Sequence, residues 1–184
     1  MRHELRLRRR GVTGIRRVLA TRAIVARLRR LPAFRAARTI ALYWPADGEP
    51  DVRALAPEAR ARGKRLYLPV VGRGGRMRFA PWKEHGRLRR NRYGIPEPLG
   101  PRWRQSSNLD LVIAPLVAFD SHCRRLGMGG GYYDRALQRR SRKPVLVGAA
   151  FALQEVPAVP NQPWDVPLDL VVTERARHKR GARA

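Results

Sequence analysis

The sequence predicts an α/β fold: a single domain with one open, mostly parallel sheet flanked by helices. Short apolar runs alternate with segments of helical spacing, which is the order of elements in such a sheet. The length of 184 residues suits one domain, and 43% hydrophobic residues can fill its core. We place the domain at residues 1–174 and expect residues 175–184 to form a basic, disordered tail.

The composition excludes several classes of protein. No apolar run is long enough for a transmembrane helix, and no apolar stretch follows the N-terminal arginines as in a secretory leader. The single cysteine, Cys123, cannot form an internal disulfide. We therefore expect a soluble monomer in the cytoplasm, without a membrane partner.

The first forty residues contain thirteen arginines and a single acid, Glu4. Apolar residues recur at steps of three and four, which predicts an amphipathic helix with a buried stripe and an arginine-covered outer face. The apolar positions are Ile15, Val18, Leu19, Ile24, Val25, Leu28 and Leu31. We expect Pro32 to end this helix, because proline cannot donate the next backbone hydrogen bond.

The middle of the chain predicts alternating strands and helices. Residues 39–44 (TIALYW) predict a strand, and residues 51–62, which begin with an acid, predict a helix. Residues 65–71 and 77–82 predict two strands on either side of a glycine-rich turn. Residues 83–108 are polar and contain prolines, so we expect a long, irregular surface excursion.

The C-terminal half continues the same pattern. Residues 110–115 (DLVIAP) and 145–150 (VLVGAA) are short apolar runs typical of buried parallel strands. Residues 132–140 predict a helix, and residues 168–173 (LDLVVT) predict a last strand. Because ligands of open α/β sheets bind beyond the carboxyl ends of the strands, the segments after Trp44, Pro115 and Ala150 are where we expect a site.

The strongest local signal is residues 124–135, RRLGMGGGYYDR, in which four of five consecutive positions are glycine. Glycines let the backbone approach an anion and turn successive N–H groups toward it, and a helix N-terminus behind them favours negative charge. A flexible glycine turn is the alternative. The segment matches neither the P-loop nor the G-x-G-x-x-G dinucleotide fingerprint.

Three side chains next to these glycines have two interpretations each. Asp134 suits a Mg²⁺ ligand beside bound phosphates, or it is a carboxylate that stabilises the helix dipole. Tyr132 and Tyr133 either stack on a planar ligand or belong to the core, and the two residues by themselves favour the core interpretation.

Residues 109–138, LDLVIAPLVAFDSHCRRLGMGGGYYDRALQ, closely resemble the signature of the 5-formyltetrahydrofolate cyclo-ligases, also called methenyltetrahydrofolate synthetases. The resemblance covers nearly the whole chain, through LYWPADGEPD, GKRLYLP, NRYGIPEP and WDVPLDLVVTE in order. It implies an ATP- and Mg²⁺-dependent ring closure. The formyl oxygen of 5-formyltetrahydrofolate attacks the γ-phosphate, and N10 then displaces phosphate as 5,10-methenyltetrahydrofolate forms.

The resemblance also implies roles for individual residues. The implied catalytic residues are Arg125, Tyr132 and Asp134. The implied ATP-binding residues are Arg2, Arg6, Arg125, Leu126, Gly127, Met128, Gly129, Gly130, Gly131, Tyr132 and Tyr133. The implied substrate-binding residues are Trp44, Glu49, Met128, Gly129, Gly130, Gly131 and Tyr132, and the implied Mg²⁺ ligands are Asp134 and Asp165. Tyr93 and Glu97 of NRYGIPEP are implied as pocket wall.

Read without the resemblance, three of these residues are ordinary. Glu49 is then an exposed turn acid, Trp44 a core residue at a strand end, and Asp165 a turn residue between prolines. The N-terminus departs from the family, whose members usually open with a Lys and, four residues later, an Arg. Arg2 matches that Arg, and we expect either that Arg6 or a neighbouring arginine replaces the Lys or that the affinity for the nucleotide is weaker.

The net charge of +26 favours polyanionic partners. ATP and folates that carry several glutamates are both polyanions, and an arginine-rich rim would steer them into a cleft. The alternative is a nucleic-acid-binding protein on the same scaffold. Glu49, Asp134 and Asp165 argue against it, because acids in a basic groove weaken phosphate binding.

Overall fold

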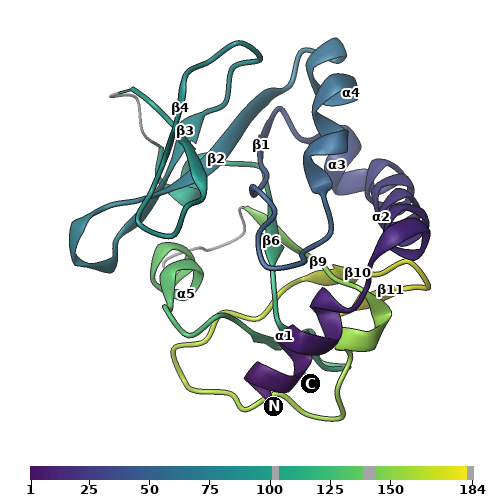
Figure 1. Ribbon diagram of the computed structural model, residues 1–184. Helices are drawn as coiled ribbons and strands as arrows, with labels where there is room; N and C mark the ends of the chain where they lie inside the picture. The colour runs from purple at the N-terminus through teal and green to yellow at the C-terminus, as the bar shows by residue number, and fades with distance from the viewer. Residues whose placement is uncertain (101–103, 139–143, 182–184) are drawn as a thin grey trace.

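The computed structural model describes residues 1–100, 104–138 and 144–181. Its centre is a seven-stranded sheet with the strand order β11-β10-β9-β6-β1-β2-β3 (Figure 1). The five inner strands run parallel to one another, and β3 and β11 pair antiparallel at the two edges. This is the predicted α/β architecture with a mostly parallel sheet.

The sheet is formed by β1 (Thr39–Ala41), β2 (Arg65–Val71), β3 (Met77–Pro81), β6 (Leu111–Pro115), β9 (Val145–Ala149), β10 (Leu170–Val172) and β11 (Arg177–Lys179). Two small antiparallel pairs lie outside it: β4 (Leu88–Arg90) with β5 (Pro96–Pro98), and β7 (Ala118–Phe119) with β8 (Arg125–Leu126). The α-helices are α1 (Arg2–Arg10), α2 (Gly14–Arg29), α3 (Pro32–Ala36), α4 (Ala56–Ala61) and α5 (Tyr132–Leu137). Short 3₁₀ turns are η1 (Val52–Leu55), η2 (Arg73–Gly75), η3 (Ser106–Asn108) and η4 (Ala152–Gln154).

Both faces of the sheet are buried, as the apolar strand sequences predict. Leu111 and Ile113 of β6 pack into one core cluster, and the alternate residues Val112 and Ala114 pack into another. Successive side chains of a strand point to opposite faces, so an apolar residue is needed at every position when both faces are covered.

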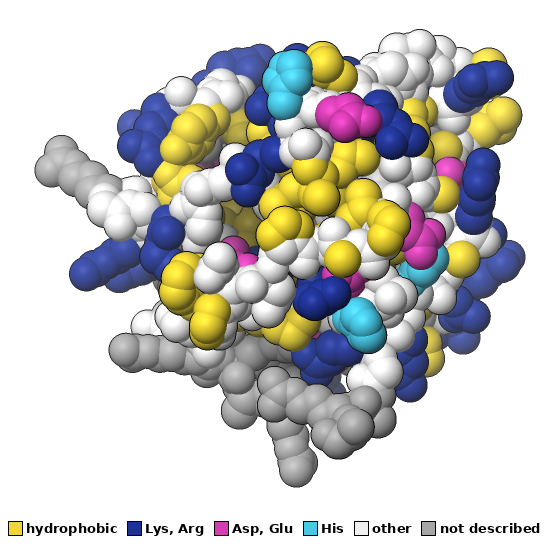
Figure 2. All heavy atoms as spheres, turned by 90° about the horizontal axis from the view of Figure 1, so that it is seen from below, with side chains coloured by type: hydrophobic (Ala, Val, Ile, Leu, Met, Phe, Trp, Pro, Cys, Tyr) yellow, Lys and Arg dark blue, Asp and Glu magenta, His cyan; other side chains and the backbone are white. Residues whose placement is uncertain are grey.

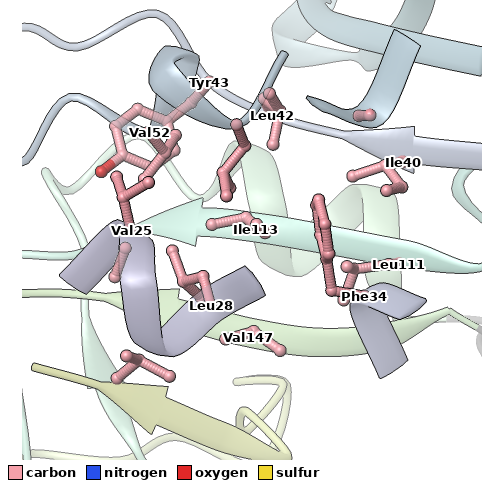
Figure 3. Close-up of a cluster of buried hydrophobic side chains, with 14 of the residues drawn as sticks. Val25, Leu28, Phe34, Ile40, Leu42, Tyr43, Val52, Leu111, Ile113 and Val147 are labelled. Atoms are coloured by element: carbon pink, nitrogen blue, oxygen red, sulfur yellow. The ribbon is translucent and has the colours of Figure 1, made fainter. Parts of the chain in front are cut away.

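Helices α2 and α3 cover one face of the sheet and α5 the other (Figure 1). Figure 3 shows the first of these two core clusters, in which Val25 and Leu28 of α2 and Phe34 of α3 pack against side chains of β1, β6 and β9. These three helix residues are at most 4% exposed. Burial of such side chains stabilises a fold by about 1.5–3 kcal/mol each.

The predicted N-terminal amphipathic helix corresponds to α2, but the prediction that Ile15, Val18 and Leu19 belong to its buried stripe is wrong. A further helix, α1, precedes it, and the chain turns between the two helices at residues 11–13. Ile15, Val18 and Leu19 are 70%, 44% and 56% exposed, so only the second half of α2 packs on the sheet. Their spacing is helical, but no element of the described part of the chain covers the face they occupy.

Several predicted boundaries also shift. Pro32 follows the end of α2 but opens α3, since the first turn of a helix does not need its missing N–H. The predicted helix at 51–62 divides into η1 and α4, and the predicted excursion at 83–108 contains β4, β5 and η3. Helix α5 ends at Leu137, and residues 139–140 of the predicted helix lie outside the described residues.

The prediction of a disordered tail is wrong for β11, where Arg177–Lys179 pair antiparallel with β10. His178 also packs edge-to-face on Phe119, with ring centroids 4.9 Å apart. The outer edge of β10 offers unpaired backbone groups, and the tail supplies their partners. The sheet therefore extends beyond residue 174, while residues 182–184 lie outside the described part. None of the helices in the described ranges is long and apolar enough to cross a membrane.

Candidate functional site

A cavity of about 1000 Å³ opens beyond the carboxyl ends of β1 and β6. Its wall is formed by the segments that follow these two strands, by α1 and by the loop that leads into α5. Figure 2 shows the molecule from the end where α1 lies, and Lys and Arg side chains are spread around this face with few acidic ones visible. The cavity lies where the topology of an open α/β sheet predicts a ligand.

Most of the residues predicted for the site line this cavity. They are Arg6, Trp44, Glu49, Arg125, Gly127, Met128, Gly129, Gly130, Gly131, Tyr132, Tyr133 and Asp134. Tyr93 and Glu97, predicted for the pocket wall, line it as well. The segments after Trp44 and Pro115 contribute to the lining as predicted, whereas the described residues after Ala150 do not.

Arg2, Leu126 and Asp165 are the predicted residues that do not line the cavity. Arg2 Nε donates to the carbonyl of Gly127 at 2.9 Å, so Arg2 lies against the glycine loop. Leu126 packs in a small core cluster with α1. Asp165 directs Oδ2 to the backbone N–H of Gln162, at 2.8 Å, as a turn residue does.

The glycine loop, residues 127–131, joins β8 to α5 and leaves its backbone open to the cavity. Gly129 and Gly131 have φ values of +100° and +62°, which other residues rarely adopt. A Cβ atom on Gly130 would lie 2.6 Å from the Tyr132 ring. Glycine is thus required by conformation at two positions and by space at a third, and an anion can approach the backbone closely.

An ion pair joins the two ends of the glycine loop. Arg125 Nη2 lies 2.5 Å from Asp134 Oδ1, and the Arg125 side chain is only 4% exposed. Both side chains also bind the backbone of Val166. Arg125 donates to its carbonyl, and Asp134 Oδ1 accepts from its N–H at 3.1 Å. These contacts fix the loop and place one positive and one negative side chain beside it.

The donor set around the loop fits a metal ion that is held mainly by phosphate. Within the described ranges, no cluster of three or more His, Cys, Asp and Glu residues could hold a metal ion. Mg²⁺ often binds through one or two carboxylates together with substrate phosphates and water. Of the two predicted ligands, Asp134 lies in the cavity wall beside the loop, whereas Asp165 is engaged with Gln162.

Glu49 is buried, not an exposed turn acid, with 6% of its surface exposed. It closes a tight turn after β1, in which Oε2 accepts from the Ala46 N–H at 3.0 Å. Arg9 Nη1 lies 3.7 Å from Oε1. Burial raises the pKa of Glu49 to about 7, because the charged form loses its hydration. The carboxyl group can therefore be charged or neutral near neutral pH.

Asp47 is a central residue of the site that the sequence did not single out. Arg6 and Arg9 bind its Oδ2 at 2.7 and 2.8 Å, and Arg10 binds Oδ1. Burial acts to raise the pKa of Asp47, but hydrogen bonds from Arg6 and Arg10 outweigh it, and the pKa is lowered. The signal was present in the sequence, because positions 6, 9 and 10 share one face of a helix.

Arg9 is completely buried and connects α1 to both strand ends. Its Nη1 donates to the Leu116 carbonyl after β6, at 2.9 Å, and its Nε donates to the Asp47 carbonyl after β1, also at 2.9 Å. A buried guanidinium is tolerated only with such partners. Arg9 and Asp47 thus hold α1 across the end of the sheet.

The aromatic residues of the site are held by neighbours but remain part of the wall. Trp44 is half-buried, packs edge-to-face on Trp82 at 6.2 Å and carries the Arg53 guanidinium 4.2 Å above its ring. It is therefore both a packed residue and a cavity residue. The Tyr132 and Tyr93 hydroxyls lie 2.6 Å apart, which joins the β4–β5 loop to the start of α5.

Comparison with known proteins gives a consistent result. A model of the 5-formyltetrahydrofolate cyclo-ligase family matches residues 1–174. The 5-formyltetrahydrofolate cyclo-ligase of Escherichia coli strain K12 is 39% identical over 174 residues, which cover 92% of this chain and 96% of the relative. That of Haemophilus influenzae is 35% identical over 178 residues, which cover 94% and 95%.

Solved structures agree with these sequence matches. The NMR structure of Aquifex aeolicus 5,10-methenyltetrahydrofolate synthetase superposes with a TM-score of 0.86 at 33% identity, over 100% of this chain and 93% of that one. A 5,10-methenyltetrahydrofolate synthetase from Mycoplasma pneumoniae superposes with a TM-score of 0.78 at 25% identity, over 94% and 96%.

Proposed function

The chain belongs to the 5-formyltetrahydrofolate cyclo-ligase family, and we propose that the cavity beyond β1 and β6 is where it converts 5-formyltetrahydrofolate to 5,10-methenyltetrahydrofolate with ATP. One observation carries the assignment of the site. The glycine loop, its flanking pair Arg125–Asp134 and the buried Glu49 line a single cavity, although they come from distant parts of the chain.

The phosphates of ATP bind along the glycine loop in this proposal. The exposed backbone and the positive side chains of Arg2, Arg6 and Arg125 would hold them. Phosphoryl transfer needs little covalent help from a protein, since positioning and neutralisation of charge supply most of the rate. The rigid loop supports the first requirement and the arginines the second.

The folate binds at the other end of the cavity. Glu49 accepts hydrogen bonds from N–H groups of the pterin ring, and the half-buried Trp44 offers an apolar edge to the same ring. Arg9 lies behind Glu49 and holds its carboxyl group in place. Tyr132, between the two ends, is supported by the hydroxyl of Tyr93.

The reaction then proceeds in two steps. The formyl oxygen attacks the γ-phosphorus, a new O–P bond forms, and the bond to the β–γ bridging oxygen breaks as ADP leaves. Next, the N10 lone pair attacks the activated formyl carbon, the C–O bond breaks, phosphate leaves and N10 loses its proton. Arg125, beside the loop, would stabilise the charge that develops on the transferred phosphoryl group.

Asp134 would hold Mg²⁺ through the carboxylate that lines the cavity. When bound, the ion neutralises charge on the β- and γ-phosphates. Asp165 as a second ligand, folates with several glutamates as preferred substrates, a monomeric state and a cytoplasmic location remain predictions. Nucleic-acid binding in place of catalysis is not favoured, since the family match extends over residues 1–174.

The purified protein, mixed with 5-formyltetrahydrofolate, ATP and Mg²⁺, should form methenyltetrahydrofolate, which is followed by its near-ultraviolet absorbance. We expect Asp134→Asn to lower kcat by about 100-fold or more, as loss of a key electrostatic group does. It should also weaken the Mg²⁺-dependent part of ATP binding in calorimetry.

Asp165→Asn is the matched control, because Asp165 does not line the cavity. An equal loss of kcat in this variant would support a metal site with two carboxylates, and a small loss would support Asp134 as the sole carboxylate ligand. Absence of product from folded wild-type protein in the presence of both ATP and Mg²⁺ would contradict the proposed activity.

A further inference from the structure

A second cavity, of about 1300 Å³, lies away from the site, at the amino end of β2 and beside the edge strand β3. None of the described residues that line it also lines the first cavity. Six of its lining residues are basic: Arg60, Lys64, Arg65, Lys83, Arg87 and Arg104. We call this cavity the basic groove. The described residues that line it include no carboxylate.

No carboxylate within the described ranges neutralises the six cations of the basic groove, although Lys64 Nζ donates to the carbonyls of Arg35 and Ala37, at 2.7 and 2.6 Å. Among the described residues, none of them forms an ion pair. The nearby Glu58 is engaged elsewhere, because it pairs with Arg29 and Arg62 at 3.0 Å each. Six unpaired positive charges in one concave surface favour a ligand with several negative charges.

The floor of the groove is apolar and includes two aromatic rings. Each ring is covered by the guanidinium group of an arginine: Arg60 lies 4.7 Å from the Trp82 centroid, and Arg104 lies 5.6 Å from the Tyr67 centroid. The backbone of Arg104 is fixed by a pair of hydrogen bonds with Phe79 of β3. The groove therefore presents planar cations at defined positions, in addition to the exposed charges of its rim.

A smaller basic cavity, of about 380 Å³, continues the groove along the amino ends of the strands. The two cavities share Arg65, Arg104 and Asn108, and the smaller one adds Arg38. The carboxylate of Asp110 in this extension is bound by the backbone N–H of Arg38 and by Thr39. The positive surface is thus longer than a single small anion requires.

We propose that the basic groove binds single-stranded nucleic acid. Exposed Arg65, Lys83 and Arg87 would pair with successive phosphates, while the guanidinium planes over Trp82 and Tyr67 would stack with bases. An acidic peptide could use the charges but not the stacking planes, so the nucleic acid explains more of the groove. This binding would occur in addition to catalysis, since the two cavities share no lining residue.

The test is fluorescence anisotropy of a labelled oligouridylate of about ten nucleotides, at about 50 to 400 mM KCl. The groove variant carries Arg65→Gln, Lys83→Gln and Arg87→Gln, at the three residues proposed to contact phosphates. The matched control carries Arg16→Gln, Arg22→Gln and Arg30→Gln at exposed positions on and just after α2. Both variants lose the same net charge, so diffuse attraction to a protein of charge +26 affects them equally.

We expect the groove variant to raise Kd at least about tenfold and to reduce the slope of log Kd against log salt by about two, as loss of three phosphate contacts to a single strand implies. The control should change Kd much less. An equal rise of Kd in both variants would show that the binding arises from diffuse charge attraction, and it would overturn the proposal. Displacement of the oligonucleotide by decaglutamate at matched charge would identify a general anion groove and would also overturn it.

Arg104→Lys provides a second, milder test, because it keeps the positive charge and removes the planar guanidinium group. It should raise Kd with an unchanged salt slope, and an unchanged Kd would contradict base stacking at this position. Thermal melts followed by circular dichroism check folding, and this single variant decides the question if a triple variant is unfolded. Wild-type-like turnover of 5-formyltetrahydrofolate in the groove variant would show that its loss of nucleic-acid binding does not arise from damage to the proposed catalytic cavity.

Discussion

At the scale of single residues, buried charged side chains lie in and behind the wall of the cavity. Glu49 and Arg9 are 6% and 0% exposed, and the Arg125 side chain is 4% exposed. Each is held by named partners: Glu49 by Ala46, Arg9 by Leu116 and Asp47, and Arg125 by Asp134. A buried charge without such partners would cost several kcal/mol, so these contacts also determine where the charges point.

Glu49 gives a prediction about stability and pH. Its pKa is raised from 4.5 to about 7 in the folded protein, so between these values the folded state binds more protons than the unfolded state. Stability therefore falls as pH rises through this window, by up to about 3 kcal/mol from this group. In Glu49→Gln this fall is absent, and the variant gains stability relative to wild type between about pH 4.5 and 7.

Chemical denaturation at several pH values measures this difference. Glu84→Gln is the control, because Glu84 is an exposed carboxyl group and should leave the pH dependence unchanged. A difference between wild type and Glu49→Gln that stays constant with pH would show that Glu49 ionises normally.

At the scale of elements, α1 is attached to the rest of the protein largely through charge. Arg6, Arg9 and Arg10 all reach Asp47, and Arg2 reaches the glycine loop. The first half of α2, by contrast, exposes its apolar residues. Helix α1 therefore obtains much of its position from these charged contacts, whereas α2 is held by the apolar residues of its second half, and Asp47 is the residue that orients α1.

Asp47→Asn should detach this helix from its anchor. The change leaves Arg9 buried with a weaker partner, and we expect a loss of about 3 kcal/mol in the free energy of unfolding. If α1 carries the nucleotide-side arginines, KM for ATP should rise at least about fivefold while kcat falls less, as loss of uniform binding does. Urea unfolding and steady-state kinetics measure the two effects.

Glu58→Gln is the matched control for Asp47→Asn. Glu58 also pairs with two arginines, but it lies on the surface of α4 and its side chain is 27% exposed. Loss of surface pairs costs about 1 kcal/mol or less and should not change KM for ATP. Similar losses in the two variants would remove the special role that we assign to Asp47.

The whole molecule carries a net charge of +26. The carboxylates of Asp47 and Asp134 are paired with arginines inside the cavity, whereas the six basic residues of the basic groove have no carboxylate partner among the described residues. An anionic substrate therefore meets a strongly positive surface before it reaches the site, and its approach should depend on salt.

Salt dependence of the enzyme tests this effect. We expect kcat/KM for 5-formyltetrahydrofolate to fall about tenfold between about 25 and 400 mM KCl, because screening removes long-range attraction. The value of kcat should change much less. The triple variant at Arg16, Arg22 and Arg30 should show a shallower fall, and a kcat/KM independent of salt would exclude steering by the net charge.

The sequence by itself determined the main alternation of strands and helices, the burial of both sheet faces and the glycine loop with Arg125 and Asp134 at its ends, but not α1, the small strand pairs or β11. These features follow from local patterns: apolar runs that fill both faces of a strand, and glycines whose φ values of +100° and +62° other residues rarely adopt. Residues close in the chain specify them.

The tertiary structure alone decided which charges meet. Arg2 contacts Gly127 and Arg9 contacts Leu116 across more than a hundred residues, and the partner of each arginine among so many could not be read from spacing. Contacts between distant segments also explain four further features: the burial of Glu49, the exposure of Ile15, the pairing of β11 and the basic groove. Burial and pairing depend on which distant segment covers a residue, and only the folded chain brings that segment into contact.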